Sequence, residues 1–140
     1  MKRFIDTNVL VYAFDASAPE KRAIALRLGR ELAERGEGVI STQVMQEVYS
    51  ALTRKLGVTP VDARKAVRAA AHFEVVPSTS ALVLEALDCA IAERLSIWDA
   101  LIVTAAAAAN CLELLSEDLN DGQVIKGVRV RNPFGGDRTR

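Results

Sequence analysis

Short apolar runs alternate along this chain with longer segments in which apolar residues recur at helical spacing. The apolar runs predict five strands, which cover residues 3–6, 39–40, 73–76, 112–115 and 128–130. Strands that alternate with helices in this way are typical of an α/β domain. The pattern indicates neither an internal repeat nor a linker.

Turn and capping residues mark where the helices begin and end. We expect helices over residues 8–14, 17–35, 42–56, 60–71, 79–94 and 97–109. Ser17 and Glu20 have the spacing of a capping box, and Ser41 or Thr42 and then Thr59 can cap the next two helices. The last helix is apolar almost all round, which predicts that it is buried in the centre of the fold.

The composition is that of a compact globular protein, with 50% apolar and 26% charged residues. The length of 140 residues fits one domain, which we place at residues 1–134, followed by a disordered tail at 135–140. Lys and Arg (18) balance Asp and Glu (18), so any binding of nucleic acid must be local. Clustered cations are expected to form solvated helix faces or the rim of a phosphate path: Arg27, Arg30 and Arg35; Arg54 and Lys55; Arg64, Lys65 and Arg68.

Neither cysteine has a partner at metal-site or redox-motif spacing, and we expect Cys89 and Cys111 to be buried thiols. An acid at position 6 excludes the apolar core of a signal peptide. The weakly polar run at 100–109 is too short to span a membrane. We expect a soluble, cytoplasmic protein.

Four acids follow or begin predicted elements, and they are the strongest functional signal. Asp6 ends the first predicted strand, Asp118 follows the fourth, Glu47 lies in a helix, and Asp99 lies at the start of the buried helix. The carboxyl ends of parallel strands are where ligands bind in α/β sheets. Carboxylates that converge stay ionised only if a hard cation neutralises them. The hypothesis is a metal-dependent phosphodiester hydrolase.

Each acid also has a purely structural interpretation. Asp6 can cap the next helix, Glu47 can face solvent, Asp99 can complete a capping box with Ser96, and Asp118 can belong to a polar turn. These alternatives stay open at this point.

Two further residues suggest chemistry but are assigned to none. We expect Trp98, beside the start of a buried helix, to belong to the core, and His72 has no nucleophile or acid near it in sequence. The motifs of Ser-His-Asp hydrolases and of phosphate-binding GxxxxGK loops do not occur.

Four motifs, taken in order, resemble those of the PIN-domain family, and especially of the VapC-type toxins. They are Phe4-Ile5-Asp6-Thr7-Asn8-Val9-Leu10, Gln46-Glu47-Val48, Ile97-Trp98-Asp99-Ala100 and Leu115-Ser116-Glu117-Asp118-Leu119. The resemblance implies a three-layer fold whose central, mainly parallel sheet has five strands. It implies a ribonuclease that uses Mg²⁺ or Mn²⁺.

By the same resemblance, Asp6, Glu47, Asp99 and Asp118 are the catalytic metal ligands. Thr7 and Ser116 support the site, and Asp121 is an outer ligand, a water holder or part of the turn. The resemblance also implies an RNA substrate, a homodimer and a VapB-like antitoxin that fills the acidic groove. The alternatives are a PIN-like nuclease for structured DNA or RNA processing, and a non-catalytic α/β binding module.

Overall fold

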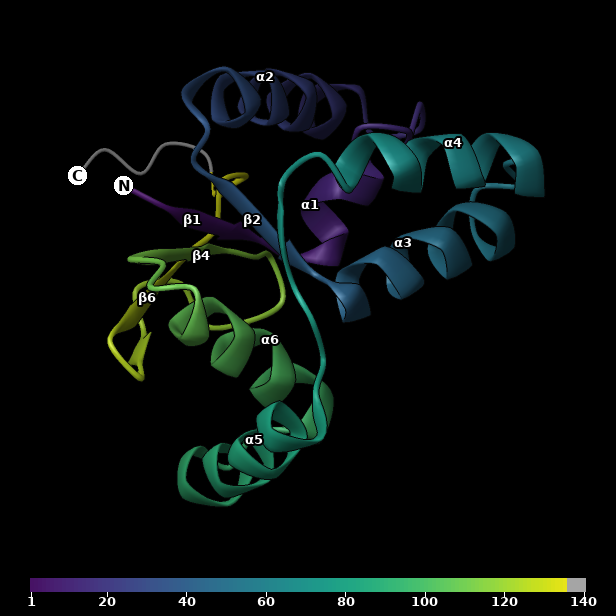
Figure 1. Cartoon of the computed structure of the whole chain (residues 1–140). Helices are drawn as coiled ribbons and strands as arrows, with labels where there is room; N and C mark the ends of the chain where they lie inside the picture. The colour runs from purple at the N-terminus through teal and green to yellow at the C-terminus, as the bar shows by residue number, and fades with distance from the viewer. Residues whose placement is uncertain (136–140) are drawn as a thin grey trace.

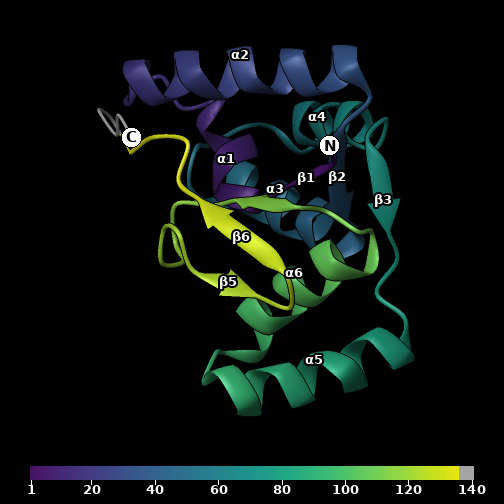
Figure 2. The same ribbon diagram turned by 90° about the vertical axis from the view of Figure 1, so that its left-hand side faces the viewer.

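A six-stranded sheet forms the centre of the computed structural model, which describes residues 1–135 (Figures 1 and 2). The strand order is β3-β2-β1-β4-β6-β5, and every neighbouring pair is parallel except β5 and β6. The strands are β1 (Arg3–Ile5), β2 (Gly38–Ser41), β3 (Glu74–Val76), β4 (Glu113–Leu115), β5 (Val124–Ile125) and β6 (Val128–Arg131).

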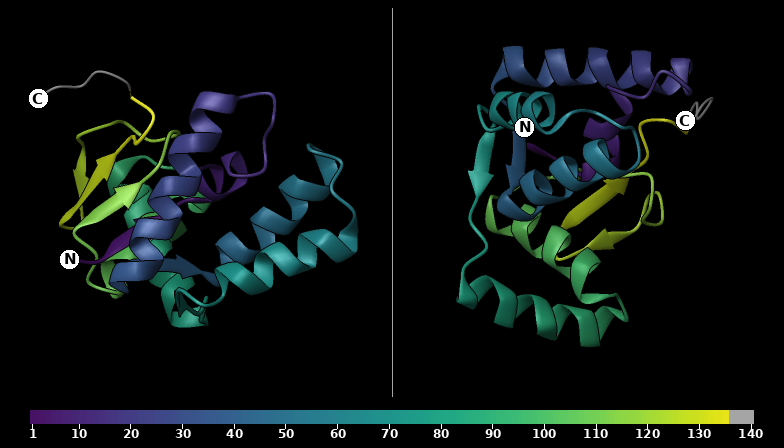
Figure 3. Two further views of the ribbon diagram at one scale, coloured as in Figure 1. Left: turned by 90° about the horizontal axis from the view of Figure 1, so that it is seen from above. Right: turned by 90° about the vertical axis from the view of Figure 1, so that its right-hand side faces the viewer.

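Helices cover both faces of this sheet. Helix α2 lies over one face and α6 over the other, with α5 packed on the outer side of α6 (Figure 2). Helices α3 and α4 pack against each other and project away from the sheet (Figure 3). The helices are α1 (Thr7–Tyr12), α2 (Pro19–Arg35), α3 (Thr42–Arg54), α4 (Pro60–Ala70), α5 (Ser80–Glu93) and α6 (Ile97–Ala108).

The predicted fold class is confirmed, but the sheet has six strands where the sequence predicted five. Strand β5 is only two residues long, too short to show an alternating pattern. It pairs with β6 across Lys126 and Gly127, whose φ angles of 53° and 79° are those of a tight hairpin turn. Strand β6 therefore lies second from the edge of the sheet, between β4 and β5.

Of the caps predicted for the helices at 17–35, 42–56 and 60–71, two are correct and one is wrong. Ser41 and Thr59 accept hydrogen bonds from the third residue after them and so cap α3 and α4. Ser17 does not cap α2, which begins at Pro19 with no side-chain cap. The Ser17 hydroxyl instead donates to Asp15 Oδ1 (2.6 Å). It is therefore bound to a nearer carboxylate and does not cap the helix.

The core lies on both sides of the strands. Phe4 and Ile40 are fully buried, and α6 is buried over seven successive residues, as its uniformly apolar sequence predicted. Both cysteines are buried free thiols, as expected. Within residues 1–135, no helix is long and apolar enough to cross a membrane. Of the predicted tail, 136–140 lie outside the described part of the chain.

Candidate metal centre

Asp6 stands where β1 passes into α1, and it is 6% exposed. Its Oδ1 accepts a hydrogen bond from the Thr7 amide (2.7 Å), and its Oδ2 accepts one from the Ser116 hydroxyl (2.7 Å). The structural alternative for Asp6 is thus correct, since it caps α1. The same two bonds fix both carboxylate oxygens at the carboxyl ends of β1 and β4.

Burial raises the pKa of Asp6 from 3.8 to about 6. The hydrogen bonds from Ser116 and Thr7 oppose this rise, and the charges of Asp118 and Glu47 add to it. Ionised Asp6 is therefore a crowded, poorly solvated charge, which a bound cation would relieve.

Glu47 reaches the same place from the cleft-facing side of α3, and it is half-buried and not solvent-facing. Its Oε1 accepts from the Thr7 hydroxyl (2.6 Å), and its Oε2 accepts from Gln43 Nε2 (3.0 Å). Gln43 Nε2 also donates to the Trp98 carbonyl (3.2 Å), which ties the first turn of α3 to the first turn of α6. Thr7 therefore orients two acids, Asp6 through its amide and Glu47 through its hydroxyl.

Asp99 enters from the first turn of α6. The Ser96 hydroxyl caps this helix by accepting from the Asp99 amide (3.1 Å), which is one of the two bonds of the predicted capping box. Partial burial raises the pKa of Asp99, the charges of Asp118 and Glu47 raise it further, and a hydrogen bond with Ser96 opposes them. Asp99 is thus both part of a helix cap and a member of the acidic group.

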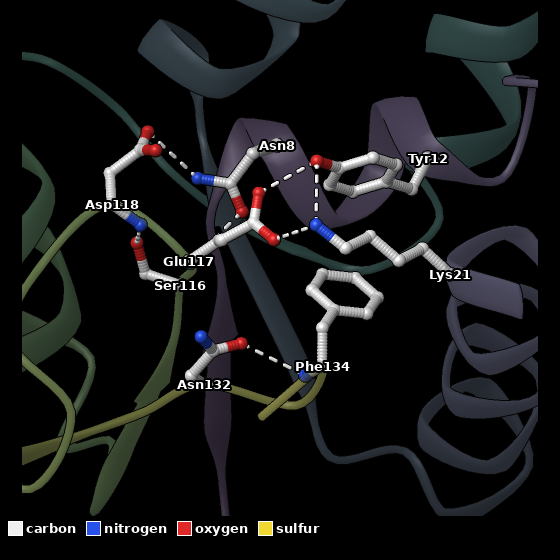
Figure 4. A network of polar contacts seen from close by, with 8 residues as sticks. All are labelled: Asn8, Tyr12, Lys21, Ser116, Glu117, Asp118, Asn132 and Phe134. Carbon is white, nitrogen blue, oxygen red and sulfur yellow. Dashed lines mark hydrogen bonds and ion pairs between the residues drawn. The ribbon is translucent and has the colours of Figure 1, made fainter. Parts of the chain in front are cut away.

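Asp118 lies in the loop after β4 and is held by two neighbours. Asn8 Nδ2 donates to Asp118 Oδ2 (2.9 Å), and the Asp118 amide donates to the Ser116 hydroxyl (3.2 Å), as Figure 4 shows. Ser116 is fully buried, and its hydroxyl bonds to both Asp6 and Asp118 and so bridges them. The sequence marked Ser116 but gave no sign of the role of Asn8.

Glu117 points away from this group into a separate network (Figure 4). Its carboxylate accepts from the Tyr12 hydroxyl (2.7 Å) and pairs with Lys21, which also lies over the rings of Tyr12 and Phe134. Partial burial acts to raise the pKa of Glu117, but Lys21 and Tyr12 outweigh it and the pKa is lowered. Asn8 Oδ1 accepts from the Glu117 amide (3.2 Å), which joins this network to Asp118.

Asp121 lies in the turn before β5, where its Oδ1 accepts from the Asn132 amide (2.8 Å). It is not among the described residues that line the cleft shared by Asp6, Glu47, Asp99 and Asp118. His72 is exposed, and among the described residues its ring bonds to the backbone carbonyls of Arg68 and Ala69, in its own segment.

The four acids line one cleft of about 680 Å³ between α1, α3 and α6. Arg54 and Lys55, at the far end of α3, line the same cleft. The core assignment of Trp98 is wrong, because the residue is 63% exposed and lines this cleft. The buried face of α6 begins at Ala100, and because this helix is apolar almost all round, its sequence pattern could not show which side Trp98 lies on.

A sequence model of the PIN domain matches residues 3–121. The chain belongs to the PIN domain family. A search of curated proteins gives no match.

Solved structures share the PIN fold with this chain. VapC20 of Mycobacterium tuberculosis, described as a sarcin-ricin loop cleaving toxin, is 19% identical over 84% of this chain and 90% of its own, with a TM-score of 0.70. VapBC2 of Rickettsia felis bound to promoter DNA is 17% identical over 94% and 98% (TM-score 0.67). DNA-bound VapBC of Salmonella typhimurium is 14% identical over 95% and 98% (TM-score 0.66).

The acidic group of this PIN domain suits a hard divalent cation in its donor chemistry. Its ligands would all be carboxylate oxygens, which Mg²⁺ and Mn²⁺ prefer. The crowding of these carboxylates is visible in the raised pKa values of Asp6 and Asp99. As they stand, no three acids, histidines or cysteines of residues 1–135 are grouped to hold an ion. Donors on the chain now satisfy Asp6, Glu47 and Asp118, so an ion would replace part of these bonds.

Proposed function

We propose that this PIN domain is a divalent-cation-dependent endoribonuclease and the toxin of a type II toxin-antitoxin pair. The observation that carries the proposal is the convergence of Asp6, Glu47, Asp99 and Asp118, from four separate segments, on one cleft. Mutual repulsion makes such a group unfavourable without a counter-charge. A phosphodiester hydrolase would use such a bound cation, because the cation would lower the pKa of water and offset charge on the phosphate.

The chain's own residues orient the acids before any substrate arrives. Thr7 and Ser116 hold Asp6, Thr7 and Gln43 hold Glu47, and Asn8 holds Asp118. This preorganisation keeps each carboxylate close to the position in which it would act. Since RNA is itself anionic, the empty cleft repels it and the loaded cleft admits it.

The toxin assignment adds partners to this chemistry. Solved VapBC complexes share the fold over nearly the whole chain. We infer a VapB-like antitoxin whose tail occupies the acidic groove, a homodimer, and action in the cytoplasm on RNA. The likeness in fold supports these partners, and their test is copurification of this chain with a small DNA-binding protein from a neighbouring gene.

Removing divalent cations is expected to abolish cleavage. With excess EDTA, single-stranded RNA stays intact because the carboxylates are left uncompensated, and added Mg²⁺ or Mn²⁺ restores cutting. The measurement is the appearance of RNA fragments on a denaturing gel, with flap-structured DNA as a parallel substrate. Unchanged cutting in EDTA would contradict the metal requirement. Cutting of the DNA but not of RNA would replace the proposed substrate class.

A further inference from the structure

The indole ring of Trp98 is an exposed aromatic surface at the edge of the acidic cleft. The residue is 63% exposed, and the next residue in the chain is Asp99, one of the four acids. Its backbone is fixed, since the Trp98 carbonyl accepts from Gln43 Nε2 (3.2 Å), the same nitrogen that holds Glu47. The ring is thus attached to backbone that is held in place beside the acids, and the ring itself is open to solvent.

Arg54 and Lys55 lie in the same cleft at the other end of α3. Among the residues that the structure describes, neither side chain makes a hydrogen bond or an ion pair. Lys21, near Glu117, is by contrast already paired with that acid. The cations that remain available to an anionic ligand of this cleft are therefore Arg54 and Lys55.

One face of α3 connects these two features. Gln43, Glu47, Ser50 and Arg54 follow one another at spacings of four, three and four residues, which places them on the same side of the helix. From Gln43 to Arg54 the helix rises by about 16 Å. At about 3.4 Å for each stacked nucleotide, that length suits a short stretch of strand and not a single nucleotide.

We propose that the cleft binds single-stranded RNA with one base stacked on Trp98, the scissile phosphate at the acids, and a phosphate farther along the strand on Arg54 and Lys55. The proposal rests on the nuclease function proposed above and assigns its substrate-binding residues. An aromatic face binds any unpaired base, whereas a paired base offers no free face. The positions of the charges agree with this proposal, because Arg54 and Lys55 lie beyond the acids along the cleft and would hold the strand across them.

The single tryptophan gives this proposal a direct test, because all tryptophan emission comes from the ring in question. To keep the RNA intact while the remaining acids stay neutralised, binding is measured at saturating Mg²⁺ in a chain that carries Asp6→Asn, using a labelled strand of about ten nucleotides. On that background, Trp98→Ala is expected to weaken binding about fivefold to hundredfold, and Trp98→Phe to restore most of it. Ile91→Ala, at a 79% exposed apolar side chain outside the cleft, is the matched control and leaves affinity unchanged.

Two further measurements separate stacking from simple contact. Saturating RNA is expected to quench Trp98 emission, while an abasic strand of the same length is not. Arg54→Gln is expected to weaken binding and to lower the slope of log affinity against log salt by about 0.7 for each phosphate that the side chain no longer neutralises.

Unchanged affinity in Trp98→Ala, or unchanged emission at saturating RNA, overturns the proposal. If the wild-type chain still cuts RNA in Mg²⁺, the nuclease function stands and only the stacking site is lost. If the wild-type chain neither binds nor cuts RNA, both proposals fail together. If Trp98→Ala dissociates a dimer in sedimentation while RNA affinity is unchanged, the ring belongs to a protein interface and the RNA site is overturned.

Discussion

Replacing Asp6 with asparagine is expected to lower RNA cleavage by more than about 100-fold while the protein stays folded. Changing a residue that merely supports a metal ligand costs about 10- to 100-fold, and Asp6 is proposed as a ligand itself. Asparagine keeps the size of the side chain, and its oxygen can still accept from the Thr7 amide while its amide donates to the Ser116 hydroxyl. The measurement is the single-turnover rate of RNA cleavage in Mg²⁺, with circular dichroism as the test of folding.

The matched control for this experiment is Asp88→Asn. Asp88 is an exposed acid on α5 and lies outside the residues that line the cleft, so its loss removes one charge without touching the site. Its cleavage rate is expected to equal that of the wild type. Cleavage by Asp6→Asn at the wild-type rate would show that the acidic cleft is not where the reaction occurs.

The free energy of unfolding is expected to depend on pH through Asp6. Its pKa is about 6 in the folded protein and 3.8 in the reference state, so between these values the folded chain keeps a proton that the unfolded chain has released. Stability contributed by this group is therefore present below pH 3.8 and is lost as pH rises through about 6. The loss amounts to roughly 3 kcal/mol, from 1.36 kcal/mol for each unit of pKa.

Asp6→Asn removes this dependence. In EDTA at neutral pH we expect the variant to be more stable than the wild type by up to roughly 3 kcal/mol, and the two to converge as the pH falls toward 3.8. Urea unfolding at a series of pH values measures the difference. Mg²⁺ added at neutral pH should stabilise the wild type more than the variant. A difference between the two proteins that does not vary with pH would contradict the burial of an ionised Asp6.

Much of the fold could be predicted because its signals are local. Ser41 and Thr59 cap the helices that follow them, and the uniformly apolar α6 is buried in the centre. The hairpin strand β5 was not predicted, because a strand of two residues is too short to show an alternating pattern of apolar and polar residues. The failure of the Ser17 cap could not be predicted, because Asp15 competes for the Ser17 hydroxyl and sequence spacing does not show which of the two partners it binds.

The meeting of Asp6 and Asp118 could also be predicted, because the carboxyl ends of neighbouring parallel strands meet at one edge of a sheet. Glu47 and Asp99 lie on α3 and α6, and it was the resemblance to the PIN family that placed them in the same group. Their role as metal ligands stays a prediction. The supporting contacts could not be predicted, since Asn8 reaches Asp118 and Lys21 reaches Glu117 across most of the chain. The exposure of Trp98 depends on how α6 is turned against its neighbours, and a helix that is apolar all round does not fix that angle.

Direct titration of Mn²⁺ into the protein by calorimetry tests the central claim, that acids from four separate segments bind one kind of ion. At neutral pH the wild type and Asp88→Asn should bind Mn²⁺ with equal affinity, and Asp6→Asn should bind it at least about tenfold more weakly. Binding that is absent from the wild type, or equal in Asp6→Asn, would contradict the account.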